Sequence, residues 1–126
     1  MESRAIVTVV DDDQSMTRML TRVLKASGYE VEIYHSAEDF LDSERDADTA
    51  CLVFDVDLPG MSGIELQSRL KRDGVSIPIL FISGQASEQT RQQALNAGAI
   101  GFLDKPFNIE SLLETIRSVD GVANPT

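Results

Sequence analysis

Five short apolar runs, separated by longer stretches with helical periodicity, constrain the fold of this chain more than any other feature of its sequence. The runs are AIVTVV (5–10), VEIY (31–34), CLVF (51–54), IPILFI (77–82) and AIGFL (99–103). They have the length of strands and are rich in β-branched and aromatic residues. Five strand–helix repeats in 126 residues predict one α/β domain with helices on both faces of a parallel sheet.

The segments between the runs carry the signals of helices. Apolar residues recur at helical spacing in 16–24, 63–73 and 109–119. Asn108 is the expected N-cap of the last helix, and Ser36 begins a pattern that resembles a capping box. Three glycines follow helical stretches, as is typical of helix ends: Gly28, Gly74 and Gly98. Only VEIY alternates, so it is expected at an edge of the sheet, and the other runs are expected to be buried on both faces.

One helix differs from the others in how little it offers for burial. In residues 87–97 only Ala94, Leu95 and Ala97 are suited to contact a core. A helix with so small an apolar footprint is easily displaced. We therefore expect this segment to be the most weakly anchored helix of the domain.

Charge and residue usage exclude several classes of function. The chain has 11 basic and 21 acidic residues and a formal net charge of −10, which repels nucleic acid phosphates. No apolar run approaches the roughly 18 residues of a membrane span, and no secretion signal precedes the first run, so a cytoplasmic protein is expected. The single cysteine, Cys51, is expected to be a buried apolar residue, and a single histidine, His35, excludes a multi-histidine metal site.

Acidic and polar residues follow four of the five runs directly. They are Asp11, Asp12 and Asp13 after the first run, Asp55 and Asp57 after the third, Ser83 and Gly84 after the fourth, and Asp104, Lys105 and Pro106 after the fifth. An acidic residue after a strand is commonly only a turn or cap residue. Ligands, however, bind outside the carboxyl ends of parallel strands. The joint placement of these residues at one edge therefore predicts a binding site.

The residue types at that edge indicate phosphate chemistry. Carboxylates within a few ångströms repel one another by about 4 kcal/mol per pair at an effective dielectric of about 20, so a cation is expected. Oxygen ligands alone favour Mg²⁺, with Mn²⁺ as a substitute. Lys105 supplies a fixed positive charge and Ser83 a hydroxyl donor, which suit a phosphoryl group. Because a carboxylate is a competent nucleophile toward phosphorus, we predict a metal-assisted aspartyl-phosphate site.

Four motifs resemble those of a known family, the receiver domains of two-component response regulators. They are VVDDD, LVFDVDLPGMSGIEL, FISG and FLDKPF, in the family's order, and the resemblance covers residues 4 to about 119. YHSAEDFL and NAGAIGFLDKPF are most similar to the nitrogen-fixation-regulator type, in which a DNA-binding domain follows. The resemblance implies a flavodoxin-like (βα)5 three-layer sandwich with strand order 2-1-3-4-5. It also implies a receiver domain over 1–120 and a tail, or the start of a missing linker, over 121–126.

The same resemblance assigns roles to the acidic residues. Asp55 is the implied phosphoacceptor, and it receives the phosphoryl group from a phosphohistidine on a partner kinase. Asp12 is expected to bind Mg²⁺ directly and Asp11 through water. Asp55 and the main-chain carbonyl of Asp57 complete the expected metal ligands. Lys105 is expected to pair with the phosphoryl oxygens.

Further residues are implied to transmit the phosphorylation signal. Ser83 would swing to hydrogen-bond the phosphoryl group, and Phe102 would move inward at the same time. The weakly anchored helix 87–97 falls on the family's signalling face, which the fourth helix, fifth strand and fifth helix form. Pro106 usually follows a cis peptide bond in this family. Asp57 also occupies a position that tunes the attack of water on the phosphate.

The expected function is that of a signalling domain. It catalyses its own magnesium-dependent phosphorylation and dephosphorylation, and no turnover of an independent substrate is expected. The implied partners are a sensor histidine kinase or phosphotransfer protein, a downstream output domain or protein, and a second copy in a phosphorylation-dependent homodimer. Direct contact with nucleic acid or a membrane is not expected. Whether the chain stands alone or precedes an output domain is left open.

Two other readings use the same residues. VFDVD resembles the first motif of haloacid-dehalogenase-type phosphatases, in which Asp55 would be the nucleophile and Asp57 the general acid. That motif normally opens its domain and is not followed by Leu58 and Pro59. A flavodoxin-like cofactor binder would share the architecture, but three carboxylates after the first strand would repel a flavin phosphate.

Overall fold

The computed structural model describes residues 5–44 and 49–119, and within these ranges five strands alternate with five helices. The strands are β1 (Ile6–Val10), β2 (Glu30–Tyr34), β3 (Thr49–Asp55), β4 (Ile79–Ser83) and β5 (Gly101–Asp104). The helices are α1 (Gln14–Ala26), α2 (Ala37–Asp42), α3 (Gly63–Arg72), α4 (Glu88–Asn96) and α5 (Ile109–Arg117). No helix of this part is long and apolar enough to cross a membrane. The expected tail, 121–126, lies outside the described residues.

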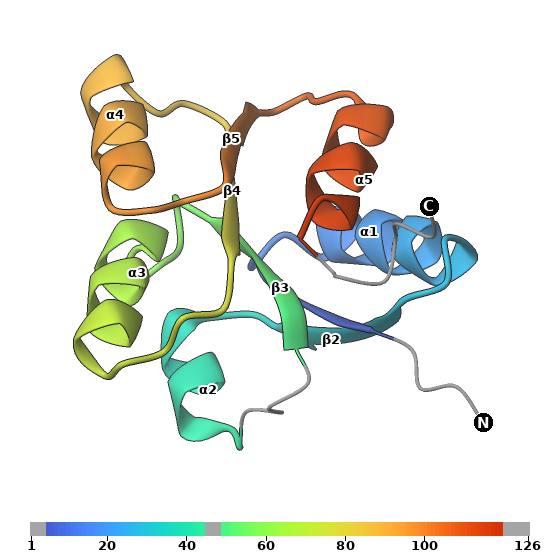
Figure 1. The fold of residues 1–126 in the computed structure, drawn as a ribbon, viewed down its shortest axis with the longest axis horizontal. Coiled ribbons are helices and arrows are strands. Elements are labelled where there is room, and N and C mark those ends of the chain that lie inside the picture. The colour runs from blue at the N-terminus through green and yellow to red at the C-terminus, as the bar shows by residue number, and fades with distance from the viewer. Residues whose placement is uncertain (1–4, 45–48, 120–126) are drawn as a thin grey trace.

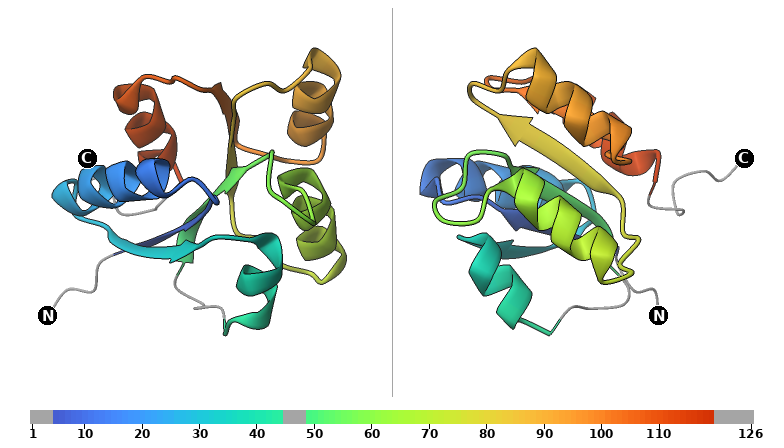
Figure 2. Two further views of the ribbon diagram at one scale, coloured as in Figure 1. Left: turned by 180° about the vertical axis from the view of Figure 1, so that it is seen from behind. Right: turned by 90° about the vertical axis from the view of Figure 1, so that its left-hand side faces the viewer.

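The five strands form one parallel sheet between two layers of helices. Their order is β2-β1-β3-β4-β5, as the family resemblance implied. Helices α1 and α5 cover one face, and α2, α3 and α4 cover the other (Figures 1 and 2). The chain thus has the three-layer α/β sandwich that was expected. All strands point the same way, so their carboxyl ends lie along one edge of the sheet.

Each face of the sheet has its own hydrophobic core. The core under α1 and α5 contains Val7, Val9, Leu20, Leu24, Tyr29, Cys51, Val53, Leu80, Ile82, Leu112, Leu113 and Ile116. Cys51 is fully buried there, which confirms the expectation from the sequence. The core under α2, α3 and α4 is formed around the other side of the same strands. Burial on both faces explains why β1, β3 and β4 are continuous apolar runs.

A row of aromatic rings crosses the sheet on the α2–α3–α4 side. Tyr34, Phe40, Phe54, Phe81 and Phe102 contact one another in sequence, with ring centroids 5.6 to 6.1 Å apart. Most of these pairs meet edge to face, the arrangement that the ring quadrupoles favour. The row runs from the partly buried Tyr34 on one edge strand to the buried Phe102 on the other, through three buried rings.

The helices begin at the caps that fix the loops beside the sheet edge. The side chain of Asp13 accepts hydrogen bonds from the first turn of α1, and Asn108 does the same for α5, as predicted. Ser36 caps α2 through its hydroxyl. The reciprocal capping box lies instead at α3, between Ser62 and Glu65.

The last two strands begin later than the apolar runs indicated, β4 at Ile79 and β5 at Gly101. Pro78 has no N–H group to donate, although its carbonyl accepts from the neighbouring strand. The N–H of Ala99 donates to the carbonyl of Ala94 and closes the end of α4. The apolar runs therefore predicted the first residues of β4 and β5 two positions too early.

Both β2 and β5 lie at edges of the sheet. The alternating run in β2 correctly predicted its edge position. The expectation that the run at 99–103 is buried on both faces is wrong, because only Phe102 of β5 is buried and Asp104 is exposed. A strand with a neighbour on one side only is less covered by the helices that flank it.

Helix α4 is the most weakly anchored of the four helices with nine or more residues, as expected. It buries only Ala94 fully, and Leu95 and Ala97 partly. A side-chain hydrogen bond supplements this contact: Nε2 of the buried Gln67 in α3 donates to the carbonyl oxygen of Ala94 at 3.1 Å. A single polar bond thus helps to hold α4 against α3.

Candidate functional site

The four polar strand ends meet at one edge of the sheet. Ser83 pairs in register with Asp104, the residue before Lys105, and Asp55 pairs with Ile82, the residue before Ser83. Asp11 directly follows β1, which neighbours β3. The parallel register therefore brings together the side chains that the sequence analysis had selected separately.

The ammonium group of Lys105 joins two buried carboxylates. Its Nζ lies 3.3 Å from Oδ2 of Asp11 and 3.3 Å from Oδ2 of Asp55. Asp11 is fully buried and Asp55 is 4% exposed. Two carboxylates shielded from water require a compensating charge, which Lys105 supplies. The peptide bond that follows it, Lys105–Pro106, is cis, as expected.

Three carboxylates offer a place for a cation. One oxygen each from Asp11, Asp12 and Asp55 lies within 4.8 Å of the others. Two of the groups are buried and Asp12 is exposed toward solvent. An all-oxygen donor set with one open side suits Mg²⁺, which retains several of its waters. The residues present therefore fit the metal that the sequence analysis expected.

The pKa values of two groups in the cluster, Asp11 and Lys105, are both raised, for different physical reasons. Burial raises the pKa of the Asp11 carboxyl from 3.8 to about 6; the backbone N–H of Asp13 opposes the rise, the charge of Asp55 adds to it, and Lys105 opposes it. Burial alone would lower the pKa of Lys105, but the charges of Asp11 and Asp55 raise it overall. Lys105 is therefore positively charged at neutral pH.

Both oxygens of Asp55 are engaged by the protein. Oδ1 accepts a hydrogen bond of 3.0 Å from the backbone N–H of Asp57, and Oδ2 faces Lys105. These contacts hold the carboxylate in one orientation at the end of β3. An oriented, nearly buried carboxylate beside a fixed cation is the arrangement that a nucleophile toward phosphorus requires.

In the part of the chain that the structure describes, the hydroxyl of Ser83 is not hydrogen-bonded to Asp55. Its Oγ donates to Oδ2 of Asp57 at 3.1 Å and accepts from the backbone N–H of Gln85 at 3.3 Å. Ser83 is fully buried, whereas Asp57 is exposed. Asp57 was expected to give Mg²⁺ only its main-chain carbonyl and to tune the attack of water on the phosphate. Its carboxylate has a partner that the sequence did not reveal.

The aromatic ring of Phe102 lies inside the protein beneath an arginine. Phe102 is 5% exposed, and the guanidinium carbon of Arg91 in α4 lies 5.5 Å from the ring centroid. Nη1 of Arg91 also lies 3.4 Å from the carbonyl oxygen of Phe102 and 3.9 Å from a carboxylate oxygen of Asp104. Arg91 thus connects α4 to β5, a contact that no pattern in the sequence indicates.

A glutamate from α2 supports the loop between β3 and α3. Oε2 of Glu38 accepts a 2.9 Å hydrogen bond from the backbone N–H of Met61, and this bond lowers the pKa of the Glu38 carboxyl. The two residues are 23 positions apart. No local sequence pattern marks such a contact, because it depends on how α2 lies against the loop.

Two more residues shape the acidic cluster through the backbone. A Cβ on Gly63 would overlap the carbonyl oxygen of Asp55, so only glycine allows α3 to start this close to the end of β3. Nδ1 of His35 lies 3.2 Å from the carbonyl oxygen of Asp11. The glycine could have been suspected from its place after Ser62, but nothing in the sequence links His35 to the cluster.

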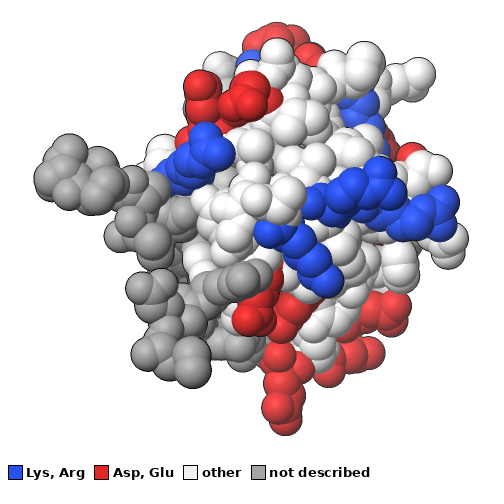
Figure 3. Space-filling model, turned by 90° about the vertical axis from the view of Figure 1, so that its right-hand side faces the viewer, with Lys and Arg blue, Asp and Glu red and all other residues white. Residues whose placement is uncertain are grey.

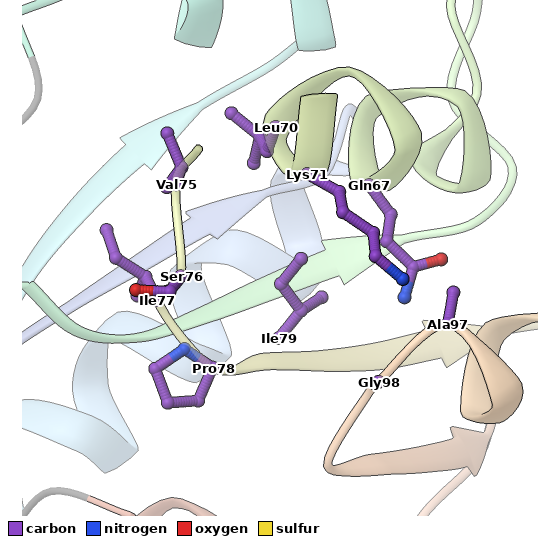
Figure 4. Close-up of a pocket in the computed structure, with 10 residues that line it drawn as sticks. All are labelled: Gln67, Leu70, Lys71, Val75, Ser76, Ile77, Pro78, Ile79, Ala97 and Gly98. Atoms are coloured by element: carbon purple, nitrogen blue, oxygen red, sulfur yellow. The ribbon is translucent and has the colours of Figure 1, made fainter. Parts of the chain in front are cut away.

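A separate pocket lies at the opposite end of β4. Its volume is about 240 Å³, and α3, the segment before β4 and the end of α4 line it (Figure 4). Gln67 and Lys71 point toward it from α3, and Ala97 and Gly98 bound its far side. None of the acidic strand-end residues lines this pocket. The candidate site is therefore the carboxylate cluster and not this pocket.

Comparisons with known proteins agree with this arrangement. The model of the family described as response regulator receiver domain matches residues 7–117. Nodulation protein W of Bradyrhizobium diazoefficiens is 43% identical over 114 residues, which are 90% of this chain and 50% of that relative. The transcriptional regulatory protein FixJ of the same organism is 34% identical over 125 residues, 99% of this chain and 61% of that relative.

The similarity extends to a solved structure. The response regulator StyR superposes with a TM-score of 0.87 at 40% identity, over 96% of this chain and 61% of that one. The chain spans about half the length of the first curated relatives it matches. The region that the family model matches, residues 7–117, contains every residue of the acidic cluster and Lys105.

Proposed function

The chain belongs to the family of response regulator receiver domains, and from this premise we propose that Asp55 is its phosphoacceptor. Receiver domains are phosphoacceptor signalling domains of two-component systems, not enzymes with an independent substrate. The observation that carries the proposal is the ammonium of Lys105, 3.3 Å from both Asp55 and Asp11 at the carboxylate cluster. The comparisons give no support to the phosphatase alternative.

The proposed reaction transfers a phosphoryl group to a carboxylate oxygen of Asp55. That oxygen forms a bond to phosphorus while the bond from phosphorus to the imidazole nitrogen of the donor breaks, and the imidazole takes up a proton. Lys105, already within 3.3 Å of Oδ2, pairs with a phosphoryl oxygen of the product. The backbone N–H of Asp57 keeps the carboxylate oriented throughout.

Receiver domains bind Mg²⁺ at an acidic pocket, and the cluster in this chain fits that ion. We propose Asp11, Asp12, Asp55 and the main-chain carbonyl of Asp57 as its protein ligands, with Mn²⁺ as a substitute. Bound Mg²⁺ would neutralise charge on the transferred phosphoryl oxygens. The proximity of three carboxylate oxygens within 4.8 Å supports this assignment.

The proposed output is a change at the surface formed by α4, β5 and α5. Ser83 would turn its hydroxyl toward the phosphoryl group, and Phe102 and α4 would adjust to it. Two observations support α4 as the element that moves: it buries only Ala94 fully, and Arg91 links it to Phe102. This surface would control an output domain or protein, or a homodimer.

Response regulators act with histidine kinases and output domains. In this chain, the exposed face of α1 suits the docking of the phosphodonor. Arg18, Arg22 and Lys25 form an exposed stripe on α1, which contains no acidic residue. Basic side chains gather on this side of the molecule (Figure 3). Within the described part of the chain, none of the three is in an ion pair. We propose that an acidic surface of the kinase or phosphotransfer protein binds along α1.

The remaining parts of the proposal concern the whole protein. We propose that residues 1–120 are the receiver domain and that 121–126 are a tail or lead into a further segment. The net charge of −10 supports a domain that does not itself contact nucleic acid. We keep the expectation of a cytoplasmic location, where a kinase partner would meet it.

Intact-mass measurement tests the assignment of Asp55. Incubation with Mg²⁺ and acetyl phosphate should add about 80 Da, the mass of one phosphoryl group. Asp55→Asn should abolish this gain, and Asp57→Asn, which keeps the main-chain groups of its residue, should retain it. Asp12→Ala should slow phosphorylation by weakening the metal. A gain that persists in Asp55→Asn but not in Asp12→Ala would overturn the assignment.

A second experiment examines Lys105. Lys105→Ala should still fold, bind Mg²⁺ and accept a phosphoryl group slowly, but phosphorylation should no longer change the α4–β5–α5 surface. Hydrogen exchange of α4 amides before and after phosphorylation reports that change. Identical responses in the variant and the wild type would refute this role for Lys105.

A further inference from the structure

The proton of the Ser83 hydroxyl is already used in a hydrogen bond before any phosphorylation. It has one proton, which it donates to Oδ2 of Asp57 at 3.1 Å, and its oxygen accepts the backbone N–H of Gln85. Ser83 is fully buried, so water does not offer the hydroxyl an equal alternative partner. The hydroxyl is thus held by a specific partner on the neighbouring loop.

The partner of Ser83 is a charged acceptor without a compensating cation. In the part of the chain that the structure describes, no Lys or Arg lies within ion-pair distance of Asp57. Lys105 contacts Asp11 and Asp55 instead. An uncompensated carboxylate is a stronger acceptor than a neutral group. The hydrogen bond from Ser83 to Asp57 therefore competes with any hydrogen bond that the same proton could form with another acceptor.

We propose that Asp57 is a positioning residue that restrains Ser83 in the unphosphorylated state and thereby sets how readily the domain switches. This inference rests on the proposed function, in which the Ser83 hydroxyl turns to a phosphoryl oxygen on Asp55. One proton cannot serve both acceptors, so the bond to Asp57 breaks when the bond to the phosphoryl group forms. A stronger hydrogen bond from Ser83 to Asp57 therefore makes the hydrogen bond from Ser83 to the phosphoryl group less favourable.

The backbone N–H of Asp57 also links this residue to the proposed phosphoacceptor. Its backbone N–H donates to Oδ1 of Asp55, while its side chain holds Ser83. Asp57 is therefore hydrogen-bonded both to the proposed phosphoacceptor at the end of β3 and to the proposed switch hydroxyl at the end of β4. A change at Asp55 and a change at Ser83 are coupled through it.

Titration with beryllofluoride, a phosphoryl mimic that binds a carboxylate, tests the proposal at saturating Mg²⁺. Asp57→Asn and Asp57→Ala are each made in two backgrounds, with Ser83 intact and with Ser83→Ala. Both substitutions at position 57 remove its charge, but only Asn keeps an acceptor for the Ser83 hydroxyl. With Ser83 intact, Asp57→Ala should bind the mimic about fivefold more tightly than Asp57→Asn, a difference of about 1 kcal/mol. In the Ser83→Ala background the two should bind equally.

Two outcomes of the titration would overturn the proposal. Equal binding by the Asn and Ala variants with Ser83 intact would mean that the acceptor does not restrain the hydroxyl. A difference that persists in the Ser83→Ala background would mean that Asp57 acts through another group.

A urea-unfolding cycle on the free chain separates this inference from the proposed function. Asp57→Ala, Ser83→Ala and the double variant should show a coupling of about fivefold in the unfolding equilibrium constant. Additive effects would show that the bond does not restrain Ser83, and would overturn the inference whatever the mimic does. Failure of beryllofluoride to bind the wild type would instead count against the function proposed for Asp55.

Discussion

Replacing Asp11 with Asn should stabilise the metal-free protein at neutral pH, although it removes a member of the acidic cluster. Asp11 is fully buried, and its pKa is raised from 3.8 to about 6. Ionising it in the folded state therefore costs up to about 3 kcal/mol at pH 7. Asn keeps an oxygen for the backbone N–H of Asp13 but carries no charge. It places an amide beside Lys105, so the gain should be smaller than this limit.

The pH dependence of the gain follows from the sign of the shift. Because the folded state holds the proton of Asp11 more tightly than the unfolded state, the contribution of this group to stability is fully present below the unfolded pKa of 3.8. It is lost as the pH rises through about 6. The difference between Asp11→Asn and wild type should therefore be small at about pH 4, grow with pH and level off above about pH 7.

Urea unfolding in the presence of a chelator measures this difference, with Asp12→Asn as the matched control. Asp12 belongs to the same cluster but is exposed, so its replacement should change stability little. Added Mg²⁺ at a hundred times its dissociation constant should stabilise the wild type by about 2.7 kcal/mol and the Asp11→Asn variant by less. A difference between Asp11→Asn and wild type that does not vary between about pH 4 and pH 7 would refute the reasoning.

Three further substitutions test how the site is supported. Gly63→Ala should destabilise the chain by about 3 kcal/mol in urea unfolding, because its Cβ would overlap the carbonyl of Asp55; an unchanged midpoint would contradict this. Gln67→Leu should speed amide exchange in the last turn of α4 by about tenfold, since one buried hydrogen bond is lost; protection equal to wild type would show that packing alone holds the helix. Glu38→Ala should speed hydrogen exchange of the Met61 backbone N–H, because the hydrogen bond to the Glu38 carboxylate is lost. The pKa of Glu38 is lowered by this bond, so the bond contributes to stability above the ordinary pKa of 4.5. The difference in exchange between variant and wild type should therefore become smaller as the pH falls below 4.5.

The sequence by itself determined the architecture and most of the candidate site. Five apolar runs separated by helical stretches predict a (βα)5 sheet, because burial on both faces leaves a continuous apolar pattern in a parallel strand. The acidic and polar residues that end four of those runs must then share one edge. For this reason Asp11, Asp55, Ser83 and Lys105 could be selected before their distances were known. Caps such as Asn108 were predictable because they act within one turn.

Only the tertiary structure decided which partner each of these groups has. The bond from Ser83 to Asp57 spans 26 residues, and the contacts of Gln67 with α4 and of Glu38 with the β3–α3 loop span 27 and 23. No local period or motif encodes such a pair, because its geometry depends on how separate elements lie against one another. The exposure of β5 was missed for the same reason. Local periodicity records which face of an element is buried, whereas the identity of the group it meets is a property of the assembled fold.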